Sequence, residues 1–213
     1  LPLVHANFFK KHTVWSIPEE SILKIFTSSG TLGQKSQMAY DRASFTTPFL
    51  IMDRYVEYLK WNTPDNPCNY LLLSYQPYKN QTIGAAYTDN YLCKYAPIHK
   101  LAYSLRLTGK EEHAFDSFGS IQALLDYEKE GLPIRIFGFP AFLFFILENM
   151  QKREIPPLKL HPNSIICFGG GWKNHADKQI DKALFYKKIT NQLGVSDSRI
   201  RSIFGSVEHC MPY

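Results

Sequence analysis

Residues 28–36 could bind phosphate. The stretch, Ser-Ser-Gly-Thr-Leu-Gly-Gln-Lys-Ser, holds two glycines, four hydroxyl side chains and one lysine. Glycine lets backbone N–H groups approach an anion closely, hydroxyls donate hydrogen bonds, and lysine adds a mobile positive charge. The stretch follows an apolar run, residues 22–26, that is typical of a short strand. We therefore predict a phosphate-binding loop after a strand, the alternative being a polar surface turn.

The spacing within this loop disfavours one class of phosphate site. A Walker A loop has the pattern G-x-x-x-x-G-K, with the lysine directly after the second glycine. Here two residues separate Gly30 from Gly33, and Gln34 stands before Lys35. We therefore do not expect a kinase-like or GTPase-like P-loop.

Apolar segments that end in glycine form a second pattern. Each of three predicted strands in the second half of the chain is followed by glycine. They are residues 134–137 before Gly138, residues 164–168 before Gly169, Gly170 and Gly171, and residues 200–204 before Gly205. In open α/β sheets, ligands bind outside the carboxyl ends of the strands. Small residues there would leave room for a flat ligand, and glycines that only make tight turns are the alternative.

Strand and helix signals alternate along the chain, which predicts an α/β fold with a largely parallel sheet flanked by helices. Residues 69–75 are a further buried strand in this prediction. Helices are expected from Pro48 with Thr47 as N-cap, from Ser117 to Gly131, over residues 141–152, and over residues 176–193 with a stop at Gly194. Residues 76–115 have weak periodicity, so they are assigned only loosely.

Composition limits the function classes. The 213 residues are 45% hydrophobic and 20% charged, which suits one globular domain with a sizeable core. The net charge of +5 is dispersed in Lys/Arg pairs, so nucleic-acid binding is not expected. The longest apolar run, residues 136–147, falls short of the roughly 20 residues that span a membrane. Without C-x-x-C pairs or a secretory signal, we expect a cytoplasmic protein without structural disulfides.

Together these motifs resemble those of adenylate-forming enzymes, the superfamily of acyl-CoA synthetases, phenylacetate-CoA ligases and luciferase-like ligases. Residues 27–35 resemble its Ser/Thr/Gly-rich phosphate loop, and residues 204–208, Phe-Gly-Ser-Val-Glu, resemble its aromatic-Gly-x-Thr-Glu motif. Residues 169–173 stand where the family has its adenine-contacting glycine loop, and residues 137–141 are similar to the Gly-x-Pro-Ser turn of phenylacetate-CoA ligases. The combination, over residues 22–213, most resembles the fatty-acid-specific acyl-protein synthetases of bacterial bioluminescence operons.

This resemblance implies an ATP-dependent, AMP-forming fatty-acid ligase. ATP and a long-chain fatty acid would give an acyl-adenylate and pyrophosphate, and the acyl group would pass to a protein cysteine. Lys35 and Thr31 would stabilise charge on the phosphates, and Glu208 would hold Mg²⁺. The residues expected around the nucleotide are Thr27, Ser28, Ser29, Gly30, Thr31, Gly33, Lys35, Gly169, Gly170, Gly171, Trp172, Phe204, Gly205 and Ser206. An acyl reductase is the expected protein partner.

Several of these residues also have a simpler interpretation. Lys35 could be an exposed loop cation, and Glu208 a surface carboxylate at a helix start. Phe204 could pack in the core, and Trp172 could be a pocket wall or a rim aromatic. An acyl tunnel and a helix buried on several sides both explain the aromatic residues Phe139, Phe142, Phe144 and Phe145. For Cys210, an inert packed cysteine is favoured over a nucleophile.

The sequence departs from the family pattern at two places. Val207 replaces the usual threonine of the Gly-x-Thr-Glu motif, and the chain ends at Tyr213, soon after that motif. The resemblance therefore implies that residues 1–213 form a single, incomplete N-terminal nucleotide-binding α/β domain without the mobile C-terminal domain. Such a chain is expected to bind nucleotide weakly and not to complete acyl transfer alone. The alternatives are a CoA-dependent ligase of the phenylacetate-CoA ligase type and a non-catalytic subunit of an acyl-reductase complex.

Overall fold

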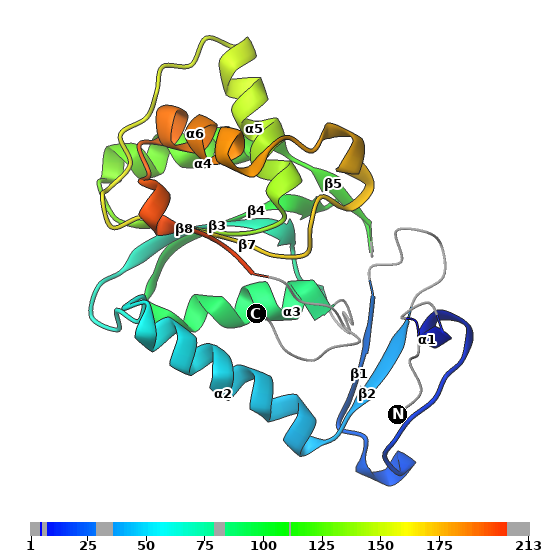
Figure 1. Ribbon diagram of the computed structural model, residues 1–213. Coiled ribbons are helices and arrows are strands. Elements are labelled where there is room, and N and C mark those ends of the chain that lie inside the picture. The colour runs from blue at the N-terminus through cyan, green and yellow to red at the C-terminus, as the bar shows by residue number, and fades with distance from the viewer. Residues whose placement is uncertain (1–4, 6–7, 29–35, 79–83, 111, 204–213) are drawn as a thin grey trace.

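The chain folds around a six-stranded sheet with helices on both faces (Figure 1). The computed structural model describes residue 5 and residues 8–28, 36–78, 84–110 and 112–203. The sheet has the order β5-β4-β3-β6-β7-β8. Its strands are β3 (Cys68–Tyr75), β4 (Ile98–Leu107), β5 (His113–Phe115), β6 (Ile134–Gly138), β7 (Ile165–Phe168) and β8 (Ile200–Ser202). Every pair is parallel except β4 with β5, so the largely parallel sheet that the sequence predicts is confirmed.

The connections of the sheet change direction at β3. From β3 the chain continues to β4 on one side, whereas β6 pairs with the other side of β3 and is followed by β7 and β8. Leu72 of β3 thus lies opposite both Tyr103 of β4 and Phe137 of β6. Where connections leave neighbouring strands in opposite directions, a crevice opens outside the carboxyl ends, and α/β folds bind ligands there. In this sheet, that position lies between β3 and β6.

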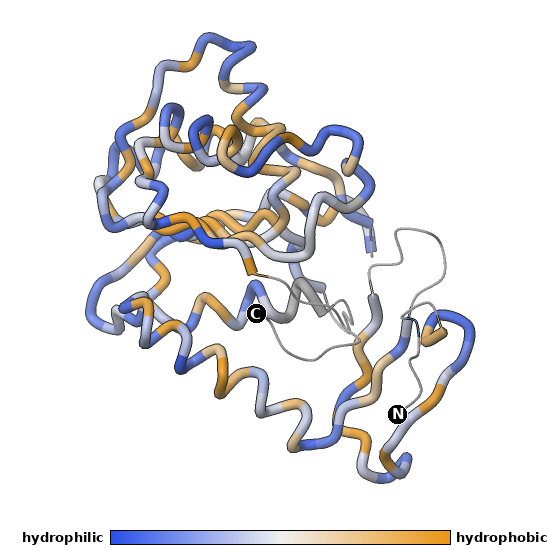
Figure 2. The backbone as a smooth tube through the Cα atoms, in the orientation of Figure 1, coloured by the Kyte–Doolittle hydropathy of each residue, from blue (hydrophilic) through white to orange (hydrophobic). Residues whose placement is uncertain are grey.

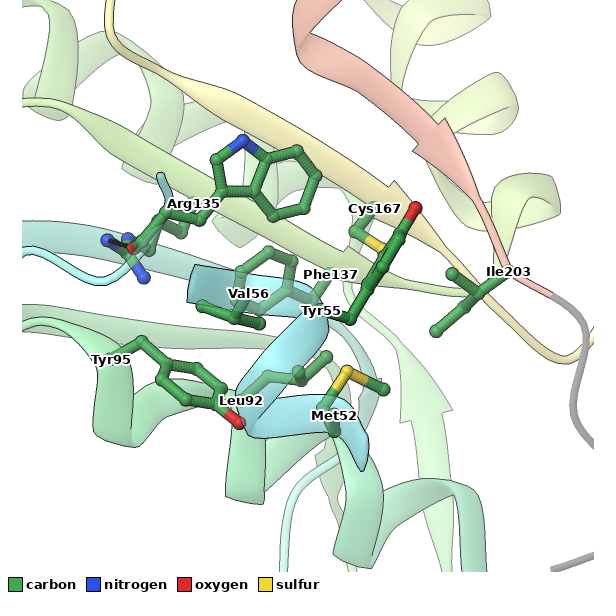
Figure 3. A pocket seen from close by; sticks show the side chains of 10 residues that line it. Met52, Tyr55, Val56, Leu92, Tyr95, Arg135, Phe137, Cys167 and Ile203 are labelled. Carbon is green, nitrogen blue, oxygen red and sulfur yellow. Dashed lines mark hydrogen bonds between the residues drawn. The ribbon is translucent and has the colours of Figure 1, made fainter. Parts of the chain in front are cut away.

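Helices α2 (Arg42–Tyr58) and α3 (Gly84–Tyr91) cover one face of the sheet, together with the short 3-10 helix η2 (Leu92–Tyr95). The core on this side, here called the α2 face, packs Met52 and Val56 of α2 against Tyr70 and Phe137 of the sheet. Figure 3 shows part of this core, with Met52 and Val56 beside Phe137.

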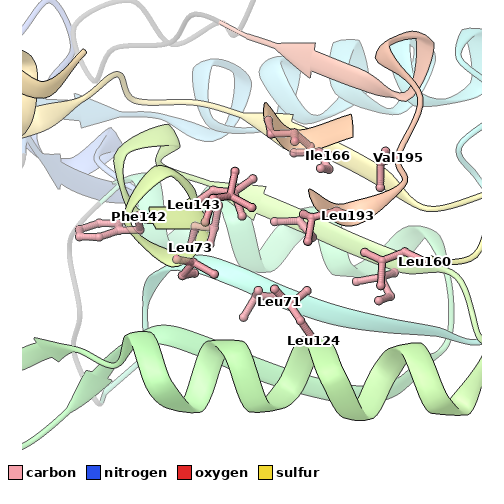
Figure 4. Packing of buried hydrophobic residues seen from close by; sticks show 14 of the residues in the cluster. Leu71, Leu73, Leu124, Phe142, Leu143, Leu160, Ile166, Leu193 and Val195 are labelled. Carbon is pink, nitrogen blue, oxygen red and sulfur yellow. The ribbon is translucent and has the colours of Figure 1, made fainter. Parts of the chain in front are cut away.

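Helices α4 (Ser117–Glu130), α5 (Pro140–Lys152) and α6 (Lys182–Leu193) cover the opposite face, here called the α5 face. Its core is aliphatic and rich in phenylalanine, and Figure 4 shows Leu71 and Leu73 of β3 among Leu124 and Leu143 of the helices. The tube coloured by hydropathy marks the strands of the sheet as a strongly apolar region (Figure 2). Because both faces of β3 are buried, its apolar residues Tyr70 to Leu73 follow one another instead of alternating with polar residues.

A two-stranded hairpin lies apart from the six-stranded sheet. In it, β1 (Lys24–Thr27) pairs antiparallel with β2 (Gln37–Tyr40). Asp41 follows β2 and caps α2, so the hairpin joins the amino end of that helix. In Figure 1 the hairpin stands on the side of the molecule to which the parallel strands point. The remaining described elements are the short helices α1 (Phe8–Lys11), η1 (Glu19–Ser21), η3 (Lys173–Lys178) and η4 (Asp197–Arg199).

The predicted start of α2 at Pro48 is wrong. Asp41, not Thr47, is the N-cap: its carboxylate accepts the amide of Ser44 at 2.7 Å, and the Ser44 hydroxyl accepts the amide of Asp41 at 3.0 Å. This reciprocal capping box satisfies two amides that a helix start otherwise leaves unpaired. The helix therefore begins earlier and contains Pro48 within it.

The predicted helix over residues 176–193 is also too long at its start. The helix begins at Lys182 because the carboxylate of Asp181 accepts the amides of Ala183 and Leu184, and residues 173–178 form η3 instead. In the same way Asp116, rather than Ser117, caps α4. The predicted stops at Gly131 and Gly194 are confirmed, since both residues have a left-handed φ, of 70° and 73°.

Candidate functional site

Neighbouring strands of the sheet end at one edge, as the sequence predicts. Gly138 is the last residue of β6, Gly169 directly follows β7, and Ile203 directly follows β8. The amide of Gly169 donates to the carbonyl of Gly138 at 3.0 Å, and the amide of Ile203 donates to the carbonyl of Phe168 at 2.8 Å. These bonds hold the three strand ends side by side. Gly138, Gly169 and Ile203 are called the carboxyl edge below.

Gly138 is required by the sheet itself. Its φ is 123°, and a Cβ at this position would lie 2.6 Å from the carbonyl oxygen of Leu73 in β3. A side chain there would force the two strands apart. The amide of Phe139 donates to the same carbonyl at 3.0 Å. Gly138 therefore brings β3 and β6 together at the position where the connections of the sheet change direction.

The glycines after β7 differ from one another. Gly170 and Gly171 have φ values of 74° and 64°, in the left-handed region that favours glycine. Gly169 is not among the glycines with positive φ, and a Cβ there would meet the Ile203 side chain at 3.6 Å, an ordinary contact. Neither the backbone nor a described neighbour requires glycine at position 169. Because Gly169 has no side chain, another group can approach its backbone closely.

Trp172 packs against aromatic side chains on the α5 face. Its ring centroid lies 5.4 Å from that of Phe144 in α5 and 5.6 Å from that of Phe185 in α6. The residue is half-buried, so it closes the apolar core beside the glycines of the carboxyl edge. A contact between Trp172 and nucleotide stays a prediction.

The aromatic residues at the start of α5 lie in the core. Phe139 and Phe142 are 1% and 9% exposed, and Phe144 and Phe145 are partly buried against the same cluster. Phe142 packs on Phe115 of β5, with 5.0 Å between the ring centroids. A helix buried on several sides accounts for all four residues.

A serine pair closes the predicted phosphate loop on the hairpin. Directly after Thr27, the amide of Ser28 donates to the carbonyl of Ser36 at 3.1 Å, and the amide of Ser36 donates to the Ser28 hydroxyl oxygen at 2.9 Å. Ser36 is fully buried, and its own hydroxyl has no hydrogen-bond partner among the described residues. The sequence motif includes Ser36 but gives it no role, because its burial depends on the return strand β2, which no local signal predicts.

Many of the predicted site residues lie outside the described part of the chain. They are Ser29, Gly30, Thr31, Gly33, Lys35, Phe204, Gly205, Ser206, Glu208 and Cys210. The structure therefore brings together Gly138, Gly169 and the end of β8, and it places Thr27 and Ser28 at the end of β1. The roles of the ten residues outside the described ranges stay predictions.

A small apolar pocket lies between α2 and the sheet (Figure 3). Met52 and Tyr55 of α2 line it together with Phe137, Cys167 and Ile203. It has room for little more than a water molecule, so a fatty acyl chain does not fit in it as it stands.

The buried thiols on the α2 face are poor nucleophiles. Burial raises the pKa of Cys93 to about 12 and that of Cys167 to about 12, and the nearby Asp89 carboxylate adds to both shifts. The thiolate is the reactive form, so both groups are inert at neutral pH. Cys68, Cys93 and Cys167 are all free.

Residues 5, 8–28, 36–78, 84–110 and 112–203 contain neither a cluster of metal-binding side chains nor a helix that could span a membrane. Within them, no group of three or more His, Cys, Asp or Glu side chains is arranged to hold a metal ion. None of the helices in these ranges combines the length and the apolar character needed to cross a membrane.

Known proteins are similar in sequence to this chain along nearly its whole length. The family model described as "Acyl-protein synthetase, LuxE" matches residues 1–211. A "Long-chain-fatty-acid--luciferin-component ligase" from Aliivibrio fischeri is 24% identical over 211 residues, and one of the same name from Vibrio harveyi is 23% identical over 210 residues. Each match covers 98% of this chain and 53% of the relative, so the chain spans about half the length of these curated relatives.

A solved structure shares the fold. The one described as "Structure of ATP bound RpMatB-BxBclM chimera B3" matches with a TM-score of 0.50 and 13% identity, over 90% of this chain and 30% of the other. At this identity the likeness concerns the fold alone, and it agrees with the α/β architecture that the sequence predicts. Because the family model covers nearly every residue, this chain belongs to the LuxE family of acyl-protein synthetases.

Proposed function

We propose that this chain forms the nucleotide-binding domain of an enzyme that activates a long-chain fatty acid with ATP. A carboxylate oxygen of the fatty acid attacks the α-phosphorus of ATP, and the bond from that phosphorus to the departing pyrophosphate breaks. The product is an acyl-adenylate, from which a protein cysteine thiolate takes the acyl group and releases AMP. The LuxE family and the names of the relatives, which are fatty-acid ligases, support this assignment.

The lack of a side chain at Gly169, where neither the backbone nor a described neighbour requires glycine, is the observation that carries the site. Gly169 lies between the ends of β6 and β8, and its described neighbours would tolerate a Cβ that the residue lacks. A flat ligand pressed against the backbone needs such a position, and the adenine ring is the flat part of ATP. The carboxyl edge is also where parallel α/β sheets bind their ligands.

The triphosphate is proposed to lie at the loop of residues 28–36. Hydrogen bonds between Ser28 and Ser36 hold the two ends of this segment together. Thr31 and Lys35 are proposed to stabilise the charge that develops on the phosphates. Glu208 is the proposed carboxylate for the Mg²⁺ that accompanies ATP. These last three residues lie outside the described part of the chain.

ATP binding to a Gly169→Ala variant tests this site. The added methyl group should leave the melting temperature nearly unchanged, since it makes only an ordinary contact with Ile203. It should weaken ATP binding about tenfold, or about 1.4 kcal/mol, because it fills the space proposed for the ligand. Isothermal titration calorimetry measures the affinity, and a thermal shift with ATP and Mg²⁺ provides a second measure, because a ligand of the folded state raises its stability.

Gly131→Ala, at the C-cap of α4, is the matched control for this experiment. Its Cβ would meet nothing within 4 Å, so its cost is backbone strain at a φ of 70° rather than loss of space. The control should therefore lose stability and keep its affinity for ATP. An unchanged affinity in Gly169→Ala, or a wild-type chain that binds no ATP at millimolar concentration, would contradict the proposed site.

Labelled myristate separates activation from transfer. We expect this chain to bind ATP without completing acyl transfer by itself, so full turnover by the chain alone would contradict that expectation. ATP–pyrophosphate exchange should require the fatty acid, and after acyl transfer the label should appear on a protein cysteine. Label on coenzyme A would favour a CoA-dependent ligase instead. An acyl reductase is the partner proposed to receive the activated acyl group.

A further inference from the structure

We propose that Phe49, Asp53 and Tyr91 are positioning residues that hold the loop-bearing hairpin in one orientation on the six-stranded sheet. The hairpin consists of β1 and β2 with residues 28–36 between them. The expected effect on ATP affinity rests on the proposed function, whereas the expected effect on the orientation of the hairpin does not.

Helix α2 is the arm that carries the hairpin. Within the described residues, β1 and β2 pair with each other and not with the six-stranded sheet. Asp41 joins β2 directly to the amino end of α2, while Met52 and Val56, further along the helix, are buried against the sheet. The helix has 17 residues, so it is about 25 Å long. Any tilt of α2 on the sheet is therefore passed on to the hairpin.

An aromatic ladder connects the hairpin to α3. Its members are Phe26 of β1, Phe45 and Phe49 of α2, and Tyr91 of α3. The ring centroids of Phe26 and Phe45 lie 6.1 Å apart with 16° between the ring planes, and those of Phe45 and Phe49 lie 5.5 Å apart. Phe49 and Tyr91 are the closest pair, at 4.2 Å. The ladder thus runs from the strand before the loop to a helix packed on the sheet.

Asp53, one helical turn after Phe49 in α2, connects α2 to α3 and η2. Its Oδ1 accepts the hydroxyl of Tyr91 at 3.0 Å and that of Tyr95 at 2.5 Å, and the ammonium group of Lys94 lies 2.7 Å away. Lys94 also stands over the Tyr91 ring, 4.1 Å from its centroid. Hydrogen bonds have preferred directions, so three donors that converge on one carboxylate define how α2 sits on α3 and η2.

Because α2 is long, a small change in its contact with α3 and η2 moves the hairpin and residues 28–36 by a larger distance. A tilt of about 5° would move the end of a helix of about 25 Å by about 2 Å. A displacement of about 1 Å in a binding or catalytic group can cost a hundredfold in rate. Contacts that leave the helix folded but allow it to tilt would therefore change the binding of a phosphate ligand more than they change stability.

Pulsed electron paramagnetic resonance measures the orientation directly. Spin labels at Leu23→Cys, beside β1, and Lys129→Cys, in α4, report the distance between the hairpin and the sheet; Leu23 is 52% exposed and the Lys129 side chain 75% exposed. A Cys210→Ser background leaves the buried Cys68, Cys93 and Cys167 as the other cysteines. The labelled wild-type chain should give one narrow distance distribution.

Phe49→Leu removes the ring that contacts Tyr91, and it should broaden or shift the distribution by about 2 Å. Tyr91→Phe keeps the ring but loses the donation to Asp53, so it should have a smaller effect in the same direction. Phe49→Tyr keeps an aromatic ring in the ladder and should restore the narrow distribution. Phe145→Leu is the matched control, because Phe145 packs on Phe144 at 5.7 Å on the other face of the sheet. This control should lose stability without moving the hairpin.

The variants that broaden or shift the distance distribution should also bind ATP more weakly. At a temperature where all variants are folded, Phe49→Leu should bind ATP about tenfold more weakly, while Phe145→Leu should bind it as the wild type does. A distribution that stays narrow in Phe49→Leu, or that broadens equally in Phe145→Leu, would overturn the inference. A broadened distribution with unchanged ATP affinity would contradict the proposed phosphate site on the hairpin. A wild-type chain that binds no ATP would contradict the proposed function, and the distance distributions would still decide the inference.

Discussion

The two faces of the six-stranded sheet are held by different kinds of contact. On the α5 face, side chains such as Leu143, Ile146 and Met150 are fully buried in an aliphatic and aromatic core. On the α2 face, buried side chains carry polar groups: the Tyr70 hydroxyl shares its proton between two backbone carbonyls at 3.1 and 3.2 Å, and the Arg135 guanidinium donates to the carbonyl of Trp61 at 2.5 Å.

This difference separates stability from orientation. The α5 face stabilises the fold mainly by burial of apolar surface, which is favourable but has little directional preference. On the α2 face, hydrogen bonds lose strength as their angle changes, and together with the aromatic ladder they define how α2 sits on the sheet. The hairpin with the predicted phosphate loop is attached to α2, and the α2 face therefore has the larger influence on the candidate site.

The largest expected effect is on the α5 face. Leu143→Ala would leave a cavity beside fully buried neighbours, and the free energy of unfolding should fall by about 3 kcal/mol in urea denaturation. The folded variant should keep its ATP affinity, because the change lies on the face away from the hairpin. Leu184→Ala, at a position 49% exposed in α6, is the control and should cost less than about 0.5 kcal/mol. A strong loss of ATP affinity in Leu143→Ala would break the distinction between the two faces.

The second largest loss of stability is expected at the carboxyl edge. Gly138→Ala would place a Cβ 2.6 Å from the Leu73 carbonyl at a φ of 123°, and we expect a loss of about 2 kcal/mol. Gly171→Ala meets no neighbour within 4 Å, and strain at its left-handed φ should cost about 1 kcal/mol. Equal losses of stability in urea would show that the close approach of β3 and β6 is not what requires glycine at position 138.

Local chemistry predicts the elements around the α5 face better than those around the α2 face. Gly131 and Gly194 end their helices because glycine adopts the left-handed conformation without strain, and this preference is visible in the sequence. Strands such as β6 and β7 are short apolar runs because both of their faces are buried. By contrast, about half of the residues of β4 are exposed, and its sequence does not alternate clearly between apolar and polar residues. The sequence therefore does not predict this ten-residue strand within residues 76–115.

At the candidate site, too, local sequence signals predict some features and miss those that depend on residues far apart in the chain. The glycines after β6 and β7 lie at one edge of the sheet as expected, because parallel neighbours finish on the same side, whereas the third glycine, Gly205, lies outside the described residues. The Thr47-Pro48 pair is a good local signal for a helix start, yet Asp41 and the packing of Phe45 on Phe26 extend α2 toward the hairpin. The serine closure of the loop joins residues eight positions apart through the return strand β2, and the sequence alone does not predict it.

Each face has a buried tyrosine, so the contribution of side-chain hydrogen bonds to stability can be compared between the two faces. Tyr70→Phe on the α2 face would leave the carbonyls of Cys93 and Ala96 without their hydroxyl donor and should cost about 1 kcal/mol. Tyr127→Phe on the α5 face removes one longer bond, of 3.3 Å to the Tyr70 carbonyl, and should cost less. Both changes keep the ring, so urea denaturation reports the hydrogen bonds. A larger loss in Tyr127→Phe would reverse the proposed difference between the faces.

The smallest effect is the pH dependence at Asp53. Burial by itself would raise the pKa of this carboxyl, but hydrogen bonds from Lys94, Tyr95 and Tyr91 outweigh burial and hold the pKa below its ordinary value of 3.8. A carboxyl whose pKa is lower in the folded state stabilises the fold above its ordinary pKa, and the contribution is lost as the pH falls through the folded value. Asp53→Asn should therefore be less stable than the wild type by up to about 1 kcal/mol at pH 7, and the difference should shrink below a pH of about 3.8.

Tyr95→Phe sharpens this last comparison, because it removes one of the three donors to Asp53 and leaves the other two. The folded pKa of Asp53 should rise toward its ordinary value, so the range of pH over which stability is lost should narrow. Urea denaturation of both variants at neutral and acid pH measures that range. A difference between the wild type and Asp53→Asn that stays constant down to pH 3 would show that the three donors do not hold an ionised carboxylate. The junction between α2 and α3 would then depend on packing, as the α5 face does.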